Sequence, residues 1–193
     1  MKKTVLKILK ILGVSFAGLL ILLVLLVYFF VNNEDVHYNA EHKTIIHQDI
    51  QEEMKDDPFV LMVLSSSCNS VTSDEGMSLI KEDIALCKAN DIPYYIVFNE
   101  LHFSQMDAIM NEFKENTSFD EPFYFIDPLA YKENIKVIQQ DRRLRDFLGA
   151  MIPEMDTVMT GYPMYYYFDK GAYQGRTHYN LKEGVETFLN LEV

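Results

Sequence analysis

Cys68 and Cys87 are the only two cysteines among the 193 residues of the chain, and their thiols are its candidate nucleophiles. Cys68 lies in the stretch VLSSSCNSV, residues 63–71, where an apolar run stops, and a polar cluster suited to capping a helix follows. A cysteine at the start of a helix meets unpaired backbone N–H groups and the positive end of the helix dipole. Both favour the thiolate and lower the thiol pKa. The pattern therefore makes Cys68 the candidate catalytic residue.

Local charge opposes this chemistry. Asp74 and Glu75 follow Cys68 closely, and no basic residue stands within ten positions on either side. Like charge disfavours a second negative group, so we expect only a modest depression of the Cys68 pKa. A second interpretation stays open, in which Cys68 is a small apolar side chain that plugs a strand–helix junction.

Cys87 belongs to the far end of the helix that follows. If Thr72–Cys87 is one helix, 19 residues at about 1.5 Å each separate the two cysteines by roughly 28 Å. A disulfide needs Cα atoms within about 7 Å, so the two cannot pair within the chain. Cys87 is therefore predicted to be a core residue, on the same helix face as Ile80 and Ile84.

The elements that position these residues alternate between strands and helices. Apolar runs of strand length stand beside stretches with helical spacing of apolar residues. The predicted strands are Phe59–Leu64, Tyr94–Phe98, Pro122–Ile126, Met164–Phe168 and Ala172–Thr177, and the main predicted helices are Thr72–Cys87, Ser104–Phe113, Ile135–Met151 and Lys182–Leu191, with a short one near Ile45–Lys55. The order predicts an α/β fold, a three-layer α/β/α sandwich with a mixed sheet.

A known superfamily shares this pattern. The strand that leads to Cys68, the later Gly161-Tyr162-Pro163 step and the hairpin turn Asp169-Lys170-Gly171 together resemble the thioredoxin-like superfamily. The resemblance covers about Phe59–Leu191, and the extra strand–helix unit Pro122–Met151 looks like the membrane-anchored TlpA and peroxiredoxin-type branch. It implies that Cys68 is the nucleophile, that Pro163 is the cis-proline beside it, and that Tyr162 and Pro163 contact substrate.

The sequence departs from the family at the second cysteine of the redox motif. Val71 stands where the resolving cysteine belongs, and a thiol without that partner stays trapped as a mixed disulfide until an outside thiol releases it. The resemblance thus implies monothiol thiol-disulfide handling of exported proteins. The alternative is a redox-inactive thioredoxin-fold scaffold or accessory protein for a secretion, bacteriocin or conjugation system. Tyr162, Tyr165 and Tyr167 either line its peptide groove or, as the alternation favours, belong to a half-buried strand.

The N-terminus carries a membrane-anchor signal. Ile11–Val31 is uncharged over 21 residues, enough to cross a bilayer as a helix and longer than a signal-peptide core. Lys2, Lys3, Lys7 and Lys10 precede it, which predicts a cytoplasmic N-terminus and an extracytoplasmic remainder. We expect a single-pass protein of a bacterial cell envelope.

Composition bounds the remaining possibilities. The net charge is −12, which argues against binding to nucleic acid. The expected partners are the membrane, through the N-terminal helix, and exported or envelope proteins. His37, His42 and His47 are five apart and cannot share one helix face, so no metal or other cofactor is expected. The predicted organisation is a cytoplasmic end (1–10), an anchor (11–31), a polar linker (32–58) and one domain (59–193). Oligomeric state does not follow from these patterns.

Overall fold

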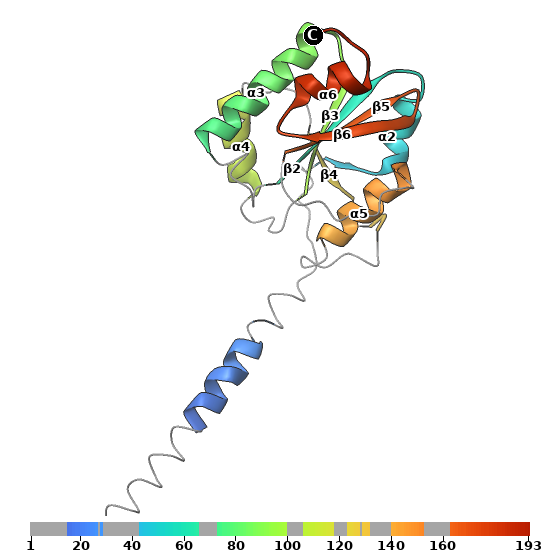
Figure 1. Ribbon diagram of the computed structural model, residues 1–193. Coiled ribbons are helices and arrows are strands. Elements are labelled where there is room, and N and C mark those ends of the chain that lie inside the picture. The colour runs from blue at the N-terminus through green and yellow to red at the C-terminus, as the bar shows by residue number, and fades with distance from the viewer. Residues whose placement is uncertain are drawn as a thin grey trace, which may run out of the picture.

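A six-stranded mixed sheet covered by helices on both faces forms the domain (Figure 1). The computed structural model describes residues 15–26, 28, 43–65, 73–99, 106–117, 123–127, 129–131, 140–152 and 163–193. The elements are β1 (Thr44–Ile45), α2 (His47–Glu53), β2 (Phe59–Leu64), α3 (Asp74–Ala89), β3 (Tyr94–Phe98), α4 (Met106–Thr117), β4 (Tyr124–Ile126), α5 (Gln140–Met151), β5 (Met164–Asp169), β6 (Ala172–His178) and α6 (Leu181–Phe188). The predicted α/β class and mixed sheet are confirmed.

The strand order is β1-β4-β3-β2-β5-β6. The first four strands of that order pair in parallel, whereas β5 is antiparallel to β2 and β6 is antiparallel to β5. A βαβ unit (β2-α3-β3) is thus joined through β5 to a hairpin and a final helix. The antiparallel hairpin beside the parallel strands makes this the mixed sheet that the sequence predicts.

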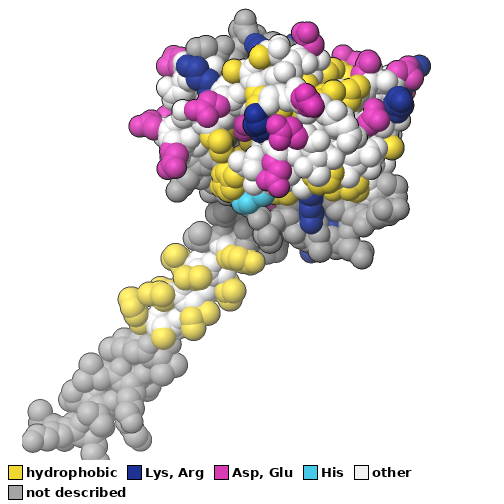
Figure 2. Space-filling view, turned by 45° about the horizontal axis from the view of Figure 1, so that its top comes forward, with side chains coloured by type: hydrophobic (Ala, Val, Ile, Leu, Met, Phe, Trp, Pro, Cys, Tyr) yellow, Lys and Arg dark blue, Asp and Glu magenta, His cyan; other side chains and the backbone are white. Residues whose placement is uncertain are grey.

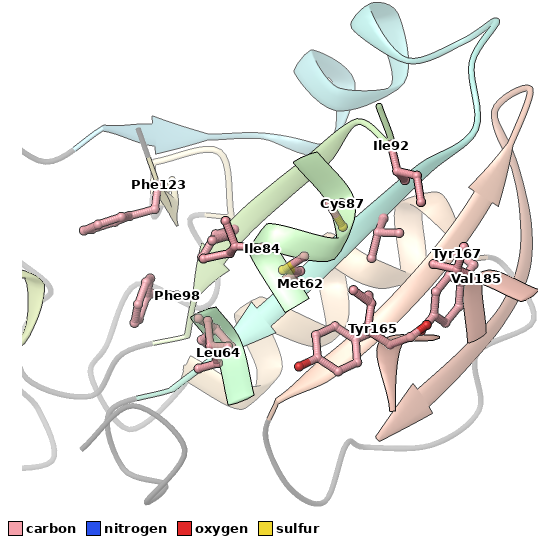
Figure 3. Close-up of a cluster of buried hydrophobic side chains, with 14 of the residues drawn as sticks. Met62, Leu64, Ile84, Cys87, Ile92, Phe98, Phe123, Tyr165, Tyr167 and Val185 are labelled. Atoms are coloured by element: carbon pink, nitrogen blue, oxygen red, sulfur yellow. The ribbon is translucent and has the colours of Figure 1, made fainter. Parts of the chain in front are cut away.

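The central strand β2 sorts its side chains onto two cores. Val60, Met62 and Leu64 pack with α3, α4 and α6 on one face (Figure 3). The alternate residues of β2 pack with α2 and α5 on the other face. Because successive strand residues point to opposite faces, a strand buried on both sides must be apolar throughout, as this run is.

Helix α3 begins and ends through side-chain and backbone caps. Ser73 is the N-cap, and its hydroxyl accepts a hydrogen bond from the Gly76 amide at 3.1 Å. At the other end the chain turns at Asp91, whose φ is 52°. Between these ends the buried face carries Cys87, as predicted, together with an acidic residue, Asp83.

The β5–β6 hairpin closes through the expected tight turn. Lys170 and Gly171 both have positive φ, 49° and 73°, as a two-residue hairpin loop of this twist requires. The strand before it differs from the half-buried strand predicted for the tyrosines. All residues from Met164 to Phe168 are buried, because α5 covers one face of β5 and α3 and α6 cover the other.

Part of the segment assigned to a polar linker packs on the sheet. Thr44 and Ile45 form the edge strand β1, and Ile50 of α2 is fully buried in the core. Residues 15–26 form a helix whose large apolar side chains are exposed. Within the described ranges, no helix has the length and apolarity needed to cross a bilayer.

Candidate functional site

The carboxyl ends of β2 and β3 meet the start of β5 at one edge of the sheet. Leu64, the last residue of β2, pairs with Phe98, the last residue of β3. Met164 pairs with Val63, so the buried Pro163 directly before it lies beside the end of β2. The segment that carries Cys68 joins this end of β2 to the N-cap of α3. Ligands of parallel sheets bind outside such carboxyl ends, which makes this edge the candidate site.

Buried polar residues follow both strands at this edge. Ser65 comes directly after β2 and is fully buried, and Asn99 comes directly after β3 with 1% exposure. The backbone N–H of Asn99 donates a hydrogen bond to the Leu64 carbonyl at 2.8 Å, which links the ends of β2 and β3. Its side-chain Nδ2 donates to Asp141 Oδ1 of α5 at 3.3 Å. The edge of the sheet is thereby linked to the start of α5.

Arg143 brings a cation to the same helix turn. It is 2% exposed, two residues beyond Asp141, and one helical turn before the buried Phe147. Its neighbours Arg142 and Arg145 are exposed. The sequence predicts one solvated, ion-paired face for this basic cluster, but the middle arginine faces inward because it shares the apolar stripe of α5.

Of the predicted site residues, Pro163 is the one that the structure places. It is buried and next to the end of β2. Cys68 and Tyr162 lie outside the described residues, and so does the peptide bond between Tyr162 and Pro163. Their roles remain predictions. Sequence reasoning missed Ser65, Asn99 and Arg143, although a polar residue directly after a buried strand is a usable signal for the first two.

Cys87 is a free cysteine in the core and not part of this edge. Its side chain is fully buried between α3 and the sheet face that this helix covers. Burial, and to a smaller extent the charge of Asp83, raises the pKa of the thiol to about 12. The thiol is therefore protonated and inaccessible at neutral pH, and the prediction of a core residue is confirmed.

Asp83 lies one turn before Cys87 and accepts a hydrogen bond from the Tyr165 hydroxyl. The pKa of this carboxyl is raised to about 6, chiefly by burial; the Tyr165 hydrogen bond opposes this rise, and the charge of Glu82 adds to it. Ten residues of helix separate Asp83 from Ser73, a rise of about 15 Å. The carboxyl therefore does not contact the start of α3.

Tyr165 and Tyr167 of β5 are core residues whose hydroxyls are hydrogen-bonded, so they do not line a groove. The Tyr167 hydroxyl lies 2.7 Å from Thr177 Oγ1 and donates to the Leu181 carbonyl at 3.2 Å. Gly184 of α6 leaves room for that ring, since a Cβ there would overlap it. The prediction that favoured a strand role for Tyr165 and Tyr167 holds, but with complete burial (Figure 3).

A surface depression of about 390 Å³ lies elsewhere. It is lined by Gln51 of α2, the end of α5 at Met151 and the hairpin residues Gly171 and Tyr173. Gly171 follows β5, whereas Pro163 precedes it, so the depression is at the other end of the strand. Pro163, the predicted site residue that the structure describes, does not line it.

Comparisons with known proteins add little to this geometry. No family model and no curated protein matches the chain. Among solved structures, the chain is similar to a thiol:disulfide interchange protein of the thioredoxin family from Chlorobium tepidum TLS. The TM-score is 0.41 and the identity is 12%, over 66% of this chain and 72% of that chain. A likeness this weak carries no argument about the fold or the activity of this chain.

Proposed function

We propose that this protein handles thiol-disulfide exchange in exported or envelope proteins through one thiol, that of Cys68. The observation that carries the proposal is the meeting of Pro163 with the end of β2. The segment with Cys68 leaves that strand end and enters the N-cap of α3. We propose that this thiol lies near the start of α3, where backbone N–H groups favour the thiolate.

The chemistry proposed is formation of a mixed disulfide. The Cys68 thiolate attacks one sulfur of a substrate disulfide, a new S–S bond forms, and the other substrate sulfur leaves as a thiolate. Cys87 does not resolve this adduct, because its thiol is buried and at the far end of α3. Release then requires a second thiol from outside the chain, such as a low-molecular-weight thiol or a partner protein.

Membrane attachment is part of the same proposal. We place Ile11–Val31 across a bilayer as a single-pass anchor, with the domain outside the cytoplasm. The described helix at 15–26 supports this, because its large apolar side chains are exposed (Figure 2). A contiguous apolar surface of that kind is unfavourable in water and is typical of a segment that lies in lipid.

Trapping of mixed disulfides tests the function. Full-length protein is expressed in a bacterial host, free thiols are blocked in acid, and adducts are separated on non-reducing gels. The wild type and Cys87→Ser should give the same discrete bands that reductant removes, and Cys68→Ser should give none. Absence of adducts from the wild type, or their survival in Cys68→Ser, would reject the proposal. The first of these results would favour the redox-inactive scaffold.

A further inference from the structure

We propose that Asp83 and Tyr165 form a proton-sensitive clamp between α3 and β5, whose packing is more stable when the buried carboxyl is protonated than when it is ionised. On ionisation the cost of burying the carboxylate outweighs its stronger hydrogen bond to Tyr165. The clamp is a property of the core and does not depend on the thiol chemistry proposed for Cys68. Neither the fold nor the proposed exchange reaction requires a hydrogen bond between this carboxyl and this phenol.

The geometry of the pair is that of a contact between distant chain segments. Asp83 is 7% exposed and lies on the buried face of α3, beside Ile84. Tyr165 is fully buried on β5 and pairs with Met62 of the central strand. Their hydrogen bond crosses from the helix layer to the sheet, between residues 82 positions apart.

The surroundings of the carboxyl give an ionised form little support. The groups that act on it electrostatically are Tyr165 and Tyr167 from β5, and the buried Cys87 and exposed Glu82 from its own helix. The β2 and α6 side chains in the same cluster are apolar. None of the groups that shift the Asp83 pKa is a cation. A buried carboxylate with one phenol donor is poorly solvated, so the proton is held more tightly than in water.

The sign of the effect follows from linkage. The pKa of Asp83 is about 6 in the folded protein and 3.8 in the exposed reference. The stabilising effect of the bound proton is complete below the lower value and is lost as the pH rises through the higher one. Two pKa units correspond to about a hundredfold in an equilibrium constant. The equilibrium for opening this contact to water should therefore be about a hundredfold more favourable at pH 8 than at a pH below 3.8.

The position of the clamp directs this change to the candidate site. Tyr165 is two residues beyond Pro163, and α3 begins where the Cys68 segment ends. Ionisation of Asp83 at neutral pH therefore destabilises the packing of α3 on β5, the two elements that border the site. Acidification stabilises this packing. The clamp acts on the stability of these two elements and not on the site residues directly, because about 15 Å of helical rise separates Asp83 from the start of α3.

Hydrogen exchange of the full-length protein in detergent micelles, followed from pH 4.5 to pH 8 and corrected for intrinsic rates, tests the clamp. In the wild type, amide protection across α3 and β5 should fall about thirtyfold with a midpoint between pH 5 and pH 6, because the linked change runs from the exposed pKa of 3.8 to the folded pKa of about 6. Asp83→Asn keeps an acceptor for Tyr165 but has no charge, so its protection should not depend on pH. Asp91→Asn, which changes an exposed acid at the end of the same helix, should behave as the wild type.

Two further variants give shifts of opposite sign. Tyr165→Phe removes the hydrogen bond that lowers the Asp83 pKa, so the midpoint should move up. Glu82→Gln removes a charge that raises it, so the midpoint should move down. A pH-dependent Asp83→Asn protein, or a midpoint unmoved by Glu82→Gln, would overturn the proposal even if Tyr165→Phe does not fold.

Discussion

Native Cys87 should be almost inert to alkylation, and the structure gives the size of the effect. A thiol with a pKa of about 12 is ionised in roughly one molecule in 10,000 at pH 8, whereas an ordinary cysteine with a pKa of about 8.5 is about one quarter ionised. Because the thiolate is the nucleophile, the rate should be about a thousandfold below that of an exposed cysteine. Complete burial of the side chain lowers it further, since iodoacetamide must wait for an opening of the core.

The assay is alkylation of the Cys68→Ser variant with iodoacetamide at pH 8, with modification of the Cys87 peptide read by mass spectrometry over time. The same protein in denaturant supplies the ordinary rate as a control. Modification of native Cys87 within tenfold of the denatured rate would refute the burial and charge that we assign to it. It would also reopen the possibility that Cys87 resolves a mixed disulfide.

Two stability predictions follow from local packing. Gly184→Ala should lower the free energy of unfolding by about 2 kcal/mol, because a Cβ overlaps the Tyr167 ring at a cost of about 3 kcal/mol and the helix propensity of alanine returns about 1 kcal/mol. The matched variant Gly149→Ala meets no atom within 4 Å and should stabilise by about 0.5–1 kcal/mol; urea unfolding that finds equal signs for the two would contradict the packing of α6 on β5. Ser73→Ala should cost about 1 kcal/mol through loss of the hydrogen bond to the Gly76 amide, and an unchanged midpoint in the same urea assay would argue that α3 does not start there.

Much of the fold could be predicted because the apolar patterns are unambiguous. The continuous run Phe59–Leu64 is typical of a strand buried on both faces, and it is the centre of the sheet. The spacing of Ile80, Ile84 and Cys87 placed the buried face of α3 correctly. These elements follow from local periodicity, which is the strongest information that a single sequence carries.

Tertiary context decided the features that could not be predicted. The two-residue strand β1 pairs at a sheet edge and has no pattern of its own, so the segment around it resembles a polar linker. Asp83 and Arg143 are charged residues on buried helix faces, where composition predicts solvent exposure. Their burial depends on partners far along the chain, such as Tyr165 for Asp83. The position of Cys68 relative to Pro163 remains a prediction of the same kind.

The pH dependence of Cys68 alkylation tests the central claim most directly. In full-length Cys87→Ser protein in detergent, Cys68 is the only thiol, and its alkylation rate from pH 5 to pH 10 gives its pKa. A helix-start thiol on the proposed exchange path predicts a half-maximal rate below the ordinary value of about 8.5, with a modest shift because Asp74 and Glu75 oppose a larger one. A pKa at or above that value would contradict the account and leave Cys68 as an inert residue of a binding scaffold.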